Sequence, residues 1–178
     1  MSHLNLDTSK VPAASQELLT QIHNAFGATP NMFKAVSNSP AALKSMWGAF
    51  GALGKGRLGA ALGEKIAVAI ANRNACEYCL AAHTVLGQGA GVTPEQMQEA
   101  QAGRAADPRT AAALNFALKL VEARGQVAAN DIAALRAVDF SDEQVVEIIA
   151  HVGLNLFTNY INIALDVPLD FPKVALIA

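Results

Sequence analysis

Apolar residues recur every three or four positions through most of the chain, which is the spacing of one face of an α-helix. Leu18, Ile22 and Phe26, for example, fall on one side of a segment that Gly27 closes. No stretch alternates apolar and polar residues between hairpin turn signals, as half-buried strands do. The pattern therefore predicts an all-α fold.

Cap residues and breaks divide this pattern into separate helices. Thr93–Pro94 followed by Gln96 is the signature of a capping box, and Ser141 is a second N-cap. The predicted helices are, in chain order, 15–26, 30–36, one from 40, one around 64–71, one from about 75 into the glycine-rich run 87–91, one from 94, one from 108 to about 125, 129–137 and one from 141. Residues 1–14 are expected to be extended and residues 51–59 to form a loop. The predicted inward face of the last helix consists of Val145, Ile148, Ile149 and Val152.

The composition fits closely packed helices in a single domain, residues 1–178. Hydrophobic residues make up 52% of the chain and charged residues only 16%, below the usual quarter or so. A chain this poor in charge is expected to cover apolar surface by forming a homo-oligomer. The net charge of −2 provides no basic footprint for nucleic acid. Without a signal-peptide pattern or an apolar run of ~20 residues, the sequence predicts a cytoplasmic protein with no membrane segment.

The candidate chemistry lies between residues 64 and 83. The only two cysteines, Cys76 and Cys79, form a C-x-x-C pair, and His83 follows four positions later. On a helix these three residues share one face, with neighbouring Cβ atoms about 5–6 Å apart. Asn74 is the predicted N-cap, which would place Cys76 in the first turn, where the helix dipole favours thiolate over thiol. In a reducing compartment such a pair is catalytic or metal-binding rather than a structural staple.

Glu64 joins this group if the chain folds back at Asn72–Asn74 into an antiparallel helix pair. Glu64 lies about as far before that break as His83 lies after it, so the two side chains would come level. A carboxylate beside His83 would orient the ring and raise its basicity. The sequence therefore predicts a proton relay from Glu64 through His83 to Cys79.

The spacing resembles a known motif. Glu64, eleven intervening residues and then Cys76-x-Tyr78-Cys79-x-x-x-His83 look like the motif of the alkylhydroperoxidase D-like branch of the carboxymuconolactone decarboxylase family. The resemblance implies a compact helical AhpD-like fold and a thiol-dependent peroxidase, an oxidoreductase that uses peroxides as acceptors. It implies that Cys79 attacks the peroxide, that Cys76 resolves the product, and that Glu64 and His83 relay the proton.

The same resemblance implies the partners. No bound cofactor is expected; an external dithiol, lipoyl-type or thioredoxin-like, would reduce the disulfide, and the assembly would be a trimer or hexamer. We expect Cys76, in the first turn, to present the more exposed sulfur to that reductant. One departure is Tyr78, which stands where the best-known member has a second histidine; a phenol is a poor base near neutral pH.

Two further residues are candidates for the pocket. Tyr78 could pack in the core or line the active site. His151 lies in an apolar helix with Asn155 and Asn159 one and two turns later, which fits either a pocket-lining residue or a hydrogen-bonded core or interface histidine. The aromatic residues Phe33, Trp47 and Phe50 are predicted to be in the core or to wall the substrate pocket.

Other functions remain open from the residues alone. Cys76, Cys79 and His83 could supply three ligands to zinc, although no second C-x-x-C or H-x-x-x-H is present to close a structural site. A carboxymuconolactone-type decarboxylase, a dithiol–disulfide oxidoreductase or redox sensor without peroxidase activity, and a metal-binding or interaction module are the alternatives. The residues themselves predict a poised dithiol; the peroxide comes from the resemblance.

A faint internal repeat relates residues 58–90 to residues 137–168. Aligning Glu143–Ala150 with Glu64–Ala71 superposes two apolar helices that begin with an acid. Cys76, Cys79 and His83 then fall on Asn155, Thr158 and Asn162. A true duplication would make the second segment a copy of the helix pair without thiols, whereas similar helix patterns also arise by chance.

Overall fold

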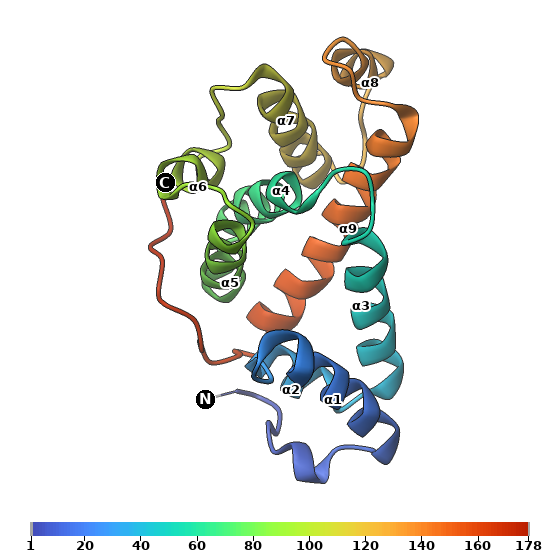
Figure 1. Ribbon diagram of the computed structural model, residues 1–178, viewed down its shortest axis with the longest axis vertical. Coiled ribbons are helices and arrows are strands. Elements are labelled where there is room, and N and C mark those ends of the chain that lie inside the picture. Colours follow the sequence, from blue (N-terminus) through green and yellow to red (C-terminus); the bar gives the residue numbers. More distant parts are fainter. Residues whose placement is uncertain (1, 178) are drawn as a thin grey trace.

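The computed structural model describes residues 2–177, which form nine α-helices, one short 3₁₀ helix and no strand, so the all-α prediction is confirmed (Figure 1). The elements are η1 (Thr8–Lys10), α1 (Ala13–Phe26), α2 (Asn31–Val36), α3 (Pro40–Leu53), α4 (Ala60–Arg73), α5 (Glu77–Gly89), α6 (Pro94–Gln101), α7 (Pro108–Glu122), α8 (Ala129–Arg136) and α9 (Asp142–Ala164).

The predicted caps begin the helices that surround the core. Ser39, Thr93, Asp107 and Ser141 each accept a backbone N–H in the first turn of the helix that follows. Thr93 and Ser141 both complete a capping box with a glutamine three positions later. These local bonds explain why the starts of α3, α6, α7 and α9 are readable from the sequence.

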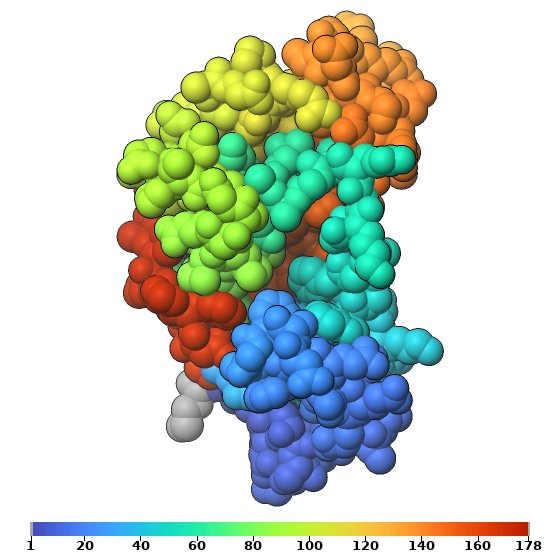
Figure 2. Space-filling view, viewed as in Figure 1, coloured from blue at the N-terminus to red at the C-terminus, as the bar shows by residue number. Residues whose placement is uncertain are grey.

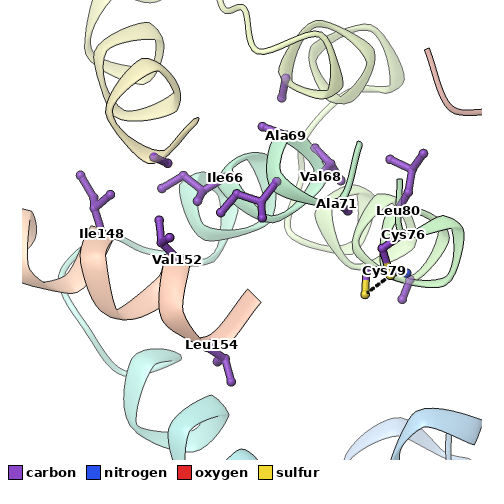
Figure 3. Packing of buried hydrophobic residues seen from close by; sticks show 14 of the residues in the cluster. Ile66, Val68, Ala69, Ala71, Cys76, Cys79, Leu80, Ile148, Val152 and Leu154 are labelled. Carbon is purple, nitrogen blue, oxygen red and sulfur yellow. Dashed lines mark hydrogen bonds between the residues drawn. The ribbon is translucent and has the colours of Figure 1, made fainter. Parts of the chain in front are cut away.

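Helix α4 is the centre of the molecule and contacts α5, α6, α7 and α9. Its segment from Ile66 to Ala71 is almost completely shielded from solvent. Figure 3 shows Ile148 and Val152 of α9 directed toward Ile66, so α9 closes one side of α4 while α5 closes another. Small side chains such as Ala67, Ala69 and Ala71 let these helices approach closely.

The structure corrects several details of the predicted helices. Ile149 is not part of the inward face: its side chain is 44% exposed, because α9 buries only one side and Ile149 points away from α4. Helix α3 runs through Gly51 to Leu53, so the predicted loop is shorter, whereas α5 ends at Gly89, inside the glycine-rich run where its end was predicted. The N-terminal segment is not simply extended, since it contains η1 and the start of α1 at Ala13.

The proposed repeat differs between its two segments. Residues 60–89 form a helix pair with a turn at Asn74, whereas α9 runs unbroken from Asp142 to Ala164. The residues that correspond to the turn lie inside a continuous helix, so the second segment is not a copy of the pair.

The segment after α9, residues 166–177, which we term the C-terminal strap, has no helix and runs back along α2 and α5 to α6 (Figures 1 and 2). Asp170 Oδ2 accepts the Asn31 N–H at 2.7 Å, and Lys173 lies 3.5 Å from Glu77. The side-chain amide of Asn72 then forms two hydrogen bonds with the backbone of Ile177: Nδ2 donates to the carbonyl oxygen, and Oδ1 accepts the N–H. No helical segment among residues 2–177 combines the length and apolar character that crossing a bilayer requires.

Candidate active site

The turn between α4 and α5 places the two cysteines. Asn74 is the C-cap of α4 and not the N-cap of α5, and Ala75 follows with φ = 54°. The Cys76 N–H then donates to the carbonyl of Ala71 and the Ala75 N–H to that of Asn72, which together form a Schellman motif. Because this motif uses Asn74 to end one helix, Cys76 itself caps the next, and its Sγ accepts the Cys79 N–H at 3.3 Å.

The two thiols are adjacent and free. Cys76 Sγ lies 2.6 Å from Cys79 Sγ, as the i,i+3 spacing predicted (Figure 3). Cys79 lines a cavity, whereas Cys76 is only 1% exposed. Cys79 is itself only 2% exposed, so both cysteines are buried, and the expectation that Cys76 has the more exposed sulfur is not supported, because the turn before α5 and not an open helix end surrounds it.

The fold-back brings Glu64 to His83. Glu64 Oε2 accepts a hydrogen bond from His83 Nδ1 at 2.7 Å, across the α4–α5 pair. This bond fixes the tautomer and leaves the lone pair of a neutral ring on Nε2. Burial alone would lower the pKa of His83, but the charge and hydrogen bond of Glu64 and the negative charge of Cys79 together raise it.

The electrostatics separate the roles available to the two cysteines. Burial tends to raise the pKa of Cys79, but the hydrogen bond from Cys76, the charge of His83 and the amides of Asn162 and Asn159 lower it to about 7. The hydrogen bond to Cys79 and burial raise the pKa of Cys76. At neutral pH the pair therefore favours a Cys79 thiolate that accepts a hydrogen bond from the Cys76 thiol.

His83 and Cys79 line the same cavity, but no direct hydrogen bond joins them within residues 2–177. A water molecule or a bound substrate between the ring and the sulfur would complete the predicted relay. The structure thus brings Glu64, His83, Cys79 and Cys76 into one site.

One face of α9 supplies site residues that the sequence did not reveal. Asn162 Nδ2 donates to Cys79 Sγ at 3.2 Å, and Asn159 Oδ1 accepts from Asn74 Nδ2 at 2.8 Å. Asn155, Asn159 and Asn162 are all buried, and Asn155 and Asn162 each have an Oδ1 without a hydrogen-bond partner in the described chain. Asn159 Nδ2 is near enough to the Cys79 sulfur to lower its pKa but does not form a hydrogen bond of good geometry with it. The detectable signal was a row of amides at helical spacing in a segment without charged residues.

The cavity above Cys79 has a volume of about 250 Å³ and is mostly apolar. Six aromatic rings contribute to its walls, namely Phe26, Phe33, Trp47, Phe50, Tyr78 and Phe171. Phe33 packs edge-on against Trp47 and Phe50, with ring centroids 5.8 and 5.9 Å apart. The polar groups Glu64, His83, Thr158 and Asn162 join Cys79 in the lining. We term this space the aromatic pocket.

Tyr78 lines the aromatic pocket and also holds neighbouring segments together. Its hydroxyl accepts the Met32 N–H at 3.2 Å, and its ring meets Phe171 of the strap at 90° with centroids 5.7 Å apart. Burial raises its pKa. Tyr78 is therefore a neutral wall residue that cannot replace a catalytic base near neutral pH.

His151 lines a different space, a second cavity of about 140 Å³ that shares Phe50, Glu64 and His83 with the aromatic pocket. Burial lowers the pKa of His151, and its ring lies so near α4 that a Cβ on Gly63 would be 3.2 Å from Cε1. Figure 2 shows the surface hollowed between α3 and α5, with α9 at the base. His151 is thus behind the Glu64–His83 pair rather than beside the thiols.

The side chains of the described residues are not arranged to bind a metal ion. No three His, Cys, Asp or Glu side chains of residues 2–177 are grouped so that they could hold a metal ion. The zinc set of Cys76, Cys79 and His83 is therefore not assembled as one.

Residues 40–123 match the model of the carboxymuconolactone decarboxylase family. No match to a curated protein was found. Among solved structures, the chain resembles an AhpD-core, peroxidase-related protein from Ralstonia eutropha JMP134, with TM-score 0.86 and 24% identity over 95% of this chain and 92% of that one. A peroxidase-related protein from Silicibacter sp. TM1040 gives TM-score 0.82 and 24% identity over 98% and 92%.

A Cys→Ala variant of the debrominase Bmp8, in complex with 2,3,4-tribromopyrrole, gives TM-score 0.77 and 19% identity over 95% of this chain and 90% of that one. At these identities the likeness concerns the fold, and the family match covers α3 to α7 together with the Glu64, Cys76, Cys79 and His83 constellation. Residues 40–123 therefore match the carboxymuconolactone decarboxylase family, and the chain has the AhpD-like fold.

Proposed function

We propose that this protein is a thiol-dependent peroxidase that reduces small organic hydroperoxides and cycles between a Cys76–Cys79 dithiol and disulfide. The observation that carries the proposal is the position of Cys79. Its sulfur lies at an apolar cavity, has a pKa lowered to about 7, and is 2.6 Å from a second sulfur. A thiolate beside a resolving thiol is the arrangement that two-electron peroxide reduction requires.

The oxidising half of the proposed cycle begins at Cys79. The thiolate attacks the terminal oxygen of the hydroperoxide, the S–O bond forms as the O–O bond breaks, and the alkoxide leaves. His83 returns to the alkoxide the proton that came from the Cys79 thiol, so an alcohol departs and Cys79 becomes a sulfenic acid. Glu64 holds the His83 ring through Nδ1 and stabilises its protonated form.

The second half closes and reopens the disulfide. The Cys76 sulfur attacks the Cys79 sulfenic acid, and its proton leaves with the hydroxyl as water. An external dithiol, lipoyl-type or on a thioredoxin-like protein, then reduces the disulfide by exchange and is itself oxidised. Since Cys76 is 1% exposed, this exchange needs local opening around the turn.

The aromatic pocket supports an organic substrate. Its volume of about 250 Å³ is the share of roughly eight waters at about 30 Å³ each, which suits a molecule of one ring or a short branched chain. An apolar tail would pack on the rings of Trp47 and Phe50, and its O–O group would meet the polar groups around Cys79.

A thiol count tests the proposal directly. Reduced, chelator-treated protein should lose two thiols per chain after one equivalent of cumene hydroperoxide, and a dithiol should restore them. Cys79→Ser should lose none, whereas Cys76→Ser should still form one sulfenate per chain. Two unreactive thiols would overturn the proposal. Disulfide exchange without peroxide consumption would indicate a redox sensor, and lactone decarboxylation by the double Cys→Ser protein would indicate the decarboxylase.

A second candidate is reductive dehalogenation of a halogenated aromatic ring, supported by the aromatic walls around a thiolate and by the fold shared with the debrominase Bmp8. In that reaction a C–Br bond is replaced by C–H, and two thiols become a disulfide with loss of HBr. Bromide release from 2,3,4-tribromopyrrole in the presence of a dithiol would favour it over peroxide reduction.

We also propose that the protein assembles with copies of itself through the outer face of α9. Val146, Tyr160 and Ile163 on this face are 64%, 63% and 49% exposed, and residues 148–165 contain no Asp, Glu, Lys or Arg. Light scattering should give a trimer or hexamer, and Tyr160→Glu should weaken it. A monomer at micromolar concentration would contradict this.

A further inference from the structure

Asn162 presents two different groups to the reacting centre. Its Nδ2 donates to Cys79 Sγ at 3.2 Å, and its Oδ1 is buried without any hydrogen-bond partner in the described chain. The residue lines the aromatic pocket and is 4% exposed. A buried, unpaired amide oxygen costs free energy unless a ligand or water supplies a donor.

We propose that Asn162 is a catalytic residue that clamps both reactants, its N–H₂ holding the Cys79 thiolate and its carbonyl accepting the O–H of the bound hydroperoxide. This inference rests on the proposed peroxidase function. The two polar atoms of one amide are adjacent, so the accepted O–H places its oxygen next to the sulfur that the same amide holds.

The clamp selects the oxygen that is transferred. The oxygen that carries the proton bonds to Cys79 Sγ, the O–O bond breaks, and the alkoxide on the other oxygen leaves with the proton from His83. The transferred O–H becomes the hydroxyl of the sulfenic acid and remains within reach of Asn162 Oδ1. No donor or acceptor has to be rearranged between substrate and product, which is the condition for a preorganised site.

The clamp itself is held by its neighbours. Asn159, one turn earlier on α9, accepts from Asn74 in the hairpin turn at 2.8 Å, which ties α9 to the segment before the cysteines. The titratable groups around Cys79 are Cys76, Tyr78 and His83 on α5 and Glu64 on α4, with Asp170 of the strap acting on Tyr78. Between Ile148 and Ala164, α9 adds only His151 and Tyr160 as titratable groups; His151 lines the second cavity with Glu64 and His83, and Tyr160 is 63% exposed.

The experiment uses the full chain with Cys76→Ser, so that Cys79 is the single thiol. Asn162→Leu removes both amide groups at similar size, and Asn155→Leu is the matched control. Asn155 is on the same face of α9 with its own unpaired Oδ1, but it donates to the carbonyl of His151 and does not touch the sulfur. Iodoacetamide, which has no hydroperoxide O–H, reports the thiolate alone.

The pH dependence of alkylation should give a Cys79 pKa about one unit higher in Asn162→Leu, which is about a fivefold loss of thiolate at pH 7, and no shift in Asn155→Leu. Two units above the pKa, alkylation should recover to within about twofold, whereas oxidation by cumene hydroperoxide should stay about tenfold slow, the loss of one hydrogen bond to the reacting group. Asn162→Asp, of equal size, should raise the pKa further.

An unchanged pKa in Asn162→Leu and Asn162→Asp would overturn the donor role. Equal recovery of alkylation and peroxide oxidation at high pH would overturn the acceptor role. A Cys76→Ser protein that is alkylated with a pKa near 7 but never oxidised by hydroperoxide would instead disprove the proposed function, and the alkylation data would still decide the donor role.

Discussion

Two cavities meet at the Glu64–His83 pair, and residue types alone hardly distinguish them. Each has Phe50 in its wall, each receives an asparagine from the same face of α9, and each of those asparagines has an unpaired buried oxygen. The aromatic pocket, however, reaches the sulfur of Cys79, where N–H, S–H and imidazole groups converge. The second cavity reaches His151, whose side chain has no hydrogen-bond partner in the described chain.

The difference shows that a reactive site requires several polar groups directed at one nucleophile, here the Cys79 sulfur. Polar residues in a cavity wall are not sufficient. In the second cavity, burial lowers the pKa of His151 and keeps the ring neutral. In the aromatic pocket, partners overcome the same desolvation and lower the pKa of Cys79. Changes on the two sides of the Glu64–His83 pair should therefore have unequal effects.

The largest inequality is expected between Cys79→Ser and His151→Gln. Cys79→Ser removes the nucleophile and should lower peroxide reduction by at least about a thousandfold. His151→Gln changes the wall of the other cavity and should stay within about twofold of the parent. Steady-state peroxide consumption with a dithiol measures both, and comparable losses would show that the two cavities form one functional unit.

Glu64→Gln is expected to have the next largest effect, because Glu64 belongs to both walls but acts through His83. Loss of the carboxylate removes the charge that raises the pKa of His83, so less imidazolium stabilises the thiolate. Sulfenate formation at neutral pH should slow by about a hundredfold. A change of less than about threefold in stopped-flow oxidation would remove Glu64 from the relay.

The two cavities should differ in the direction in which the oxidation rate changes with pH. A Cys79 pKa of about 7, lower than that of an ordinary thiol, means that the reactive thiolate is half formed near pH 7, is nearly complete one to two units above it and is lost as the pH falls below it. Single-turnover oxidation should therefore fall tenfold per pH unit below about 7 and level off above. A rate that rises as pH falls toward the lowered pKa of His151 would point to the second cavity instead.

Trimming the walls should produce a smaller difference. Trp47→Ala opens the aromatic pocket and should raise the KM for cumene hydroperoxide about tenfold, the loss of about 1.4 kcal/mol of contact. Leu53→Ala, in the second cavity, should not change that KM. Hydrogen peroxide, which has no apolar tail, should be unaffected by either, and an equal loss with both peroxides would argue against an organic substrate.

The smallest expected effect concerns the turn that both cavities depend on. Ala75 has φ = 54°, a conformation that costs alanine more than glycine. Ala75→Gly should raise the free energy of unfolding by up to about 1 kcal/mol without altering the rate of sulfenate formation. Thermal unfolding measures the change, and a lower midpoint would show that the alanine methyl group contributes packing of its own.

The sequence predicted the contacts that form within one helix, and the contact between two helices that lie antiparallel about the turn at Asn72–Asn74. Cys76 and Cys79 meet because three residues are nearly one turn, and Glu64 meets His83 because the two lie at equal distance from the turn. Asn74 was assigned to the wrong helix because a Schellman motif with alanine in place of glycine carries no clear signal.

Asn162 could not be predicted, since its contact with Cys79 spans 83 positions and depends on how α9 packs against the hairpin. For the same reason the aromatic pocket was not visible as a volume. Its rings come from α1, α2, α3, α5 and the strap, and only tertiary packing brings them around one sulfur.

The C-terminal strap affects how the oxidant and the reductant reach the two cysteines. It is fastened to Asn72 before the cysteines and to Glu77 and Tyr78 after them, and its Phe171 forms part of the wall of the aromatic pocket, which already reaches Cys79. In the proposed cycle an oxidant needs no movement of the strap, whereas a reductant has to reach the enclosed Cys76. The oxidant and the reductant would then reach the thiols by different routes. Small free thiols would not reduce the Cys76–Cys79 disulfide, and only a dithiol that docks on the protein would do so.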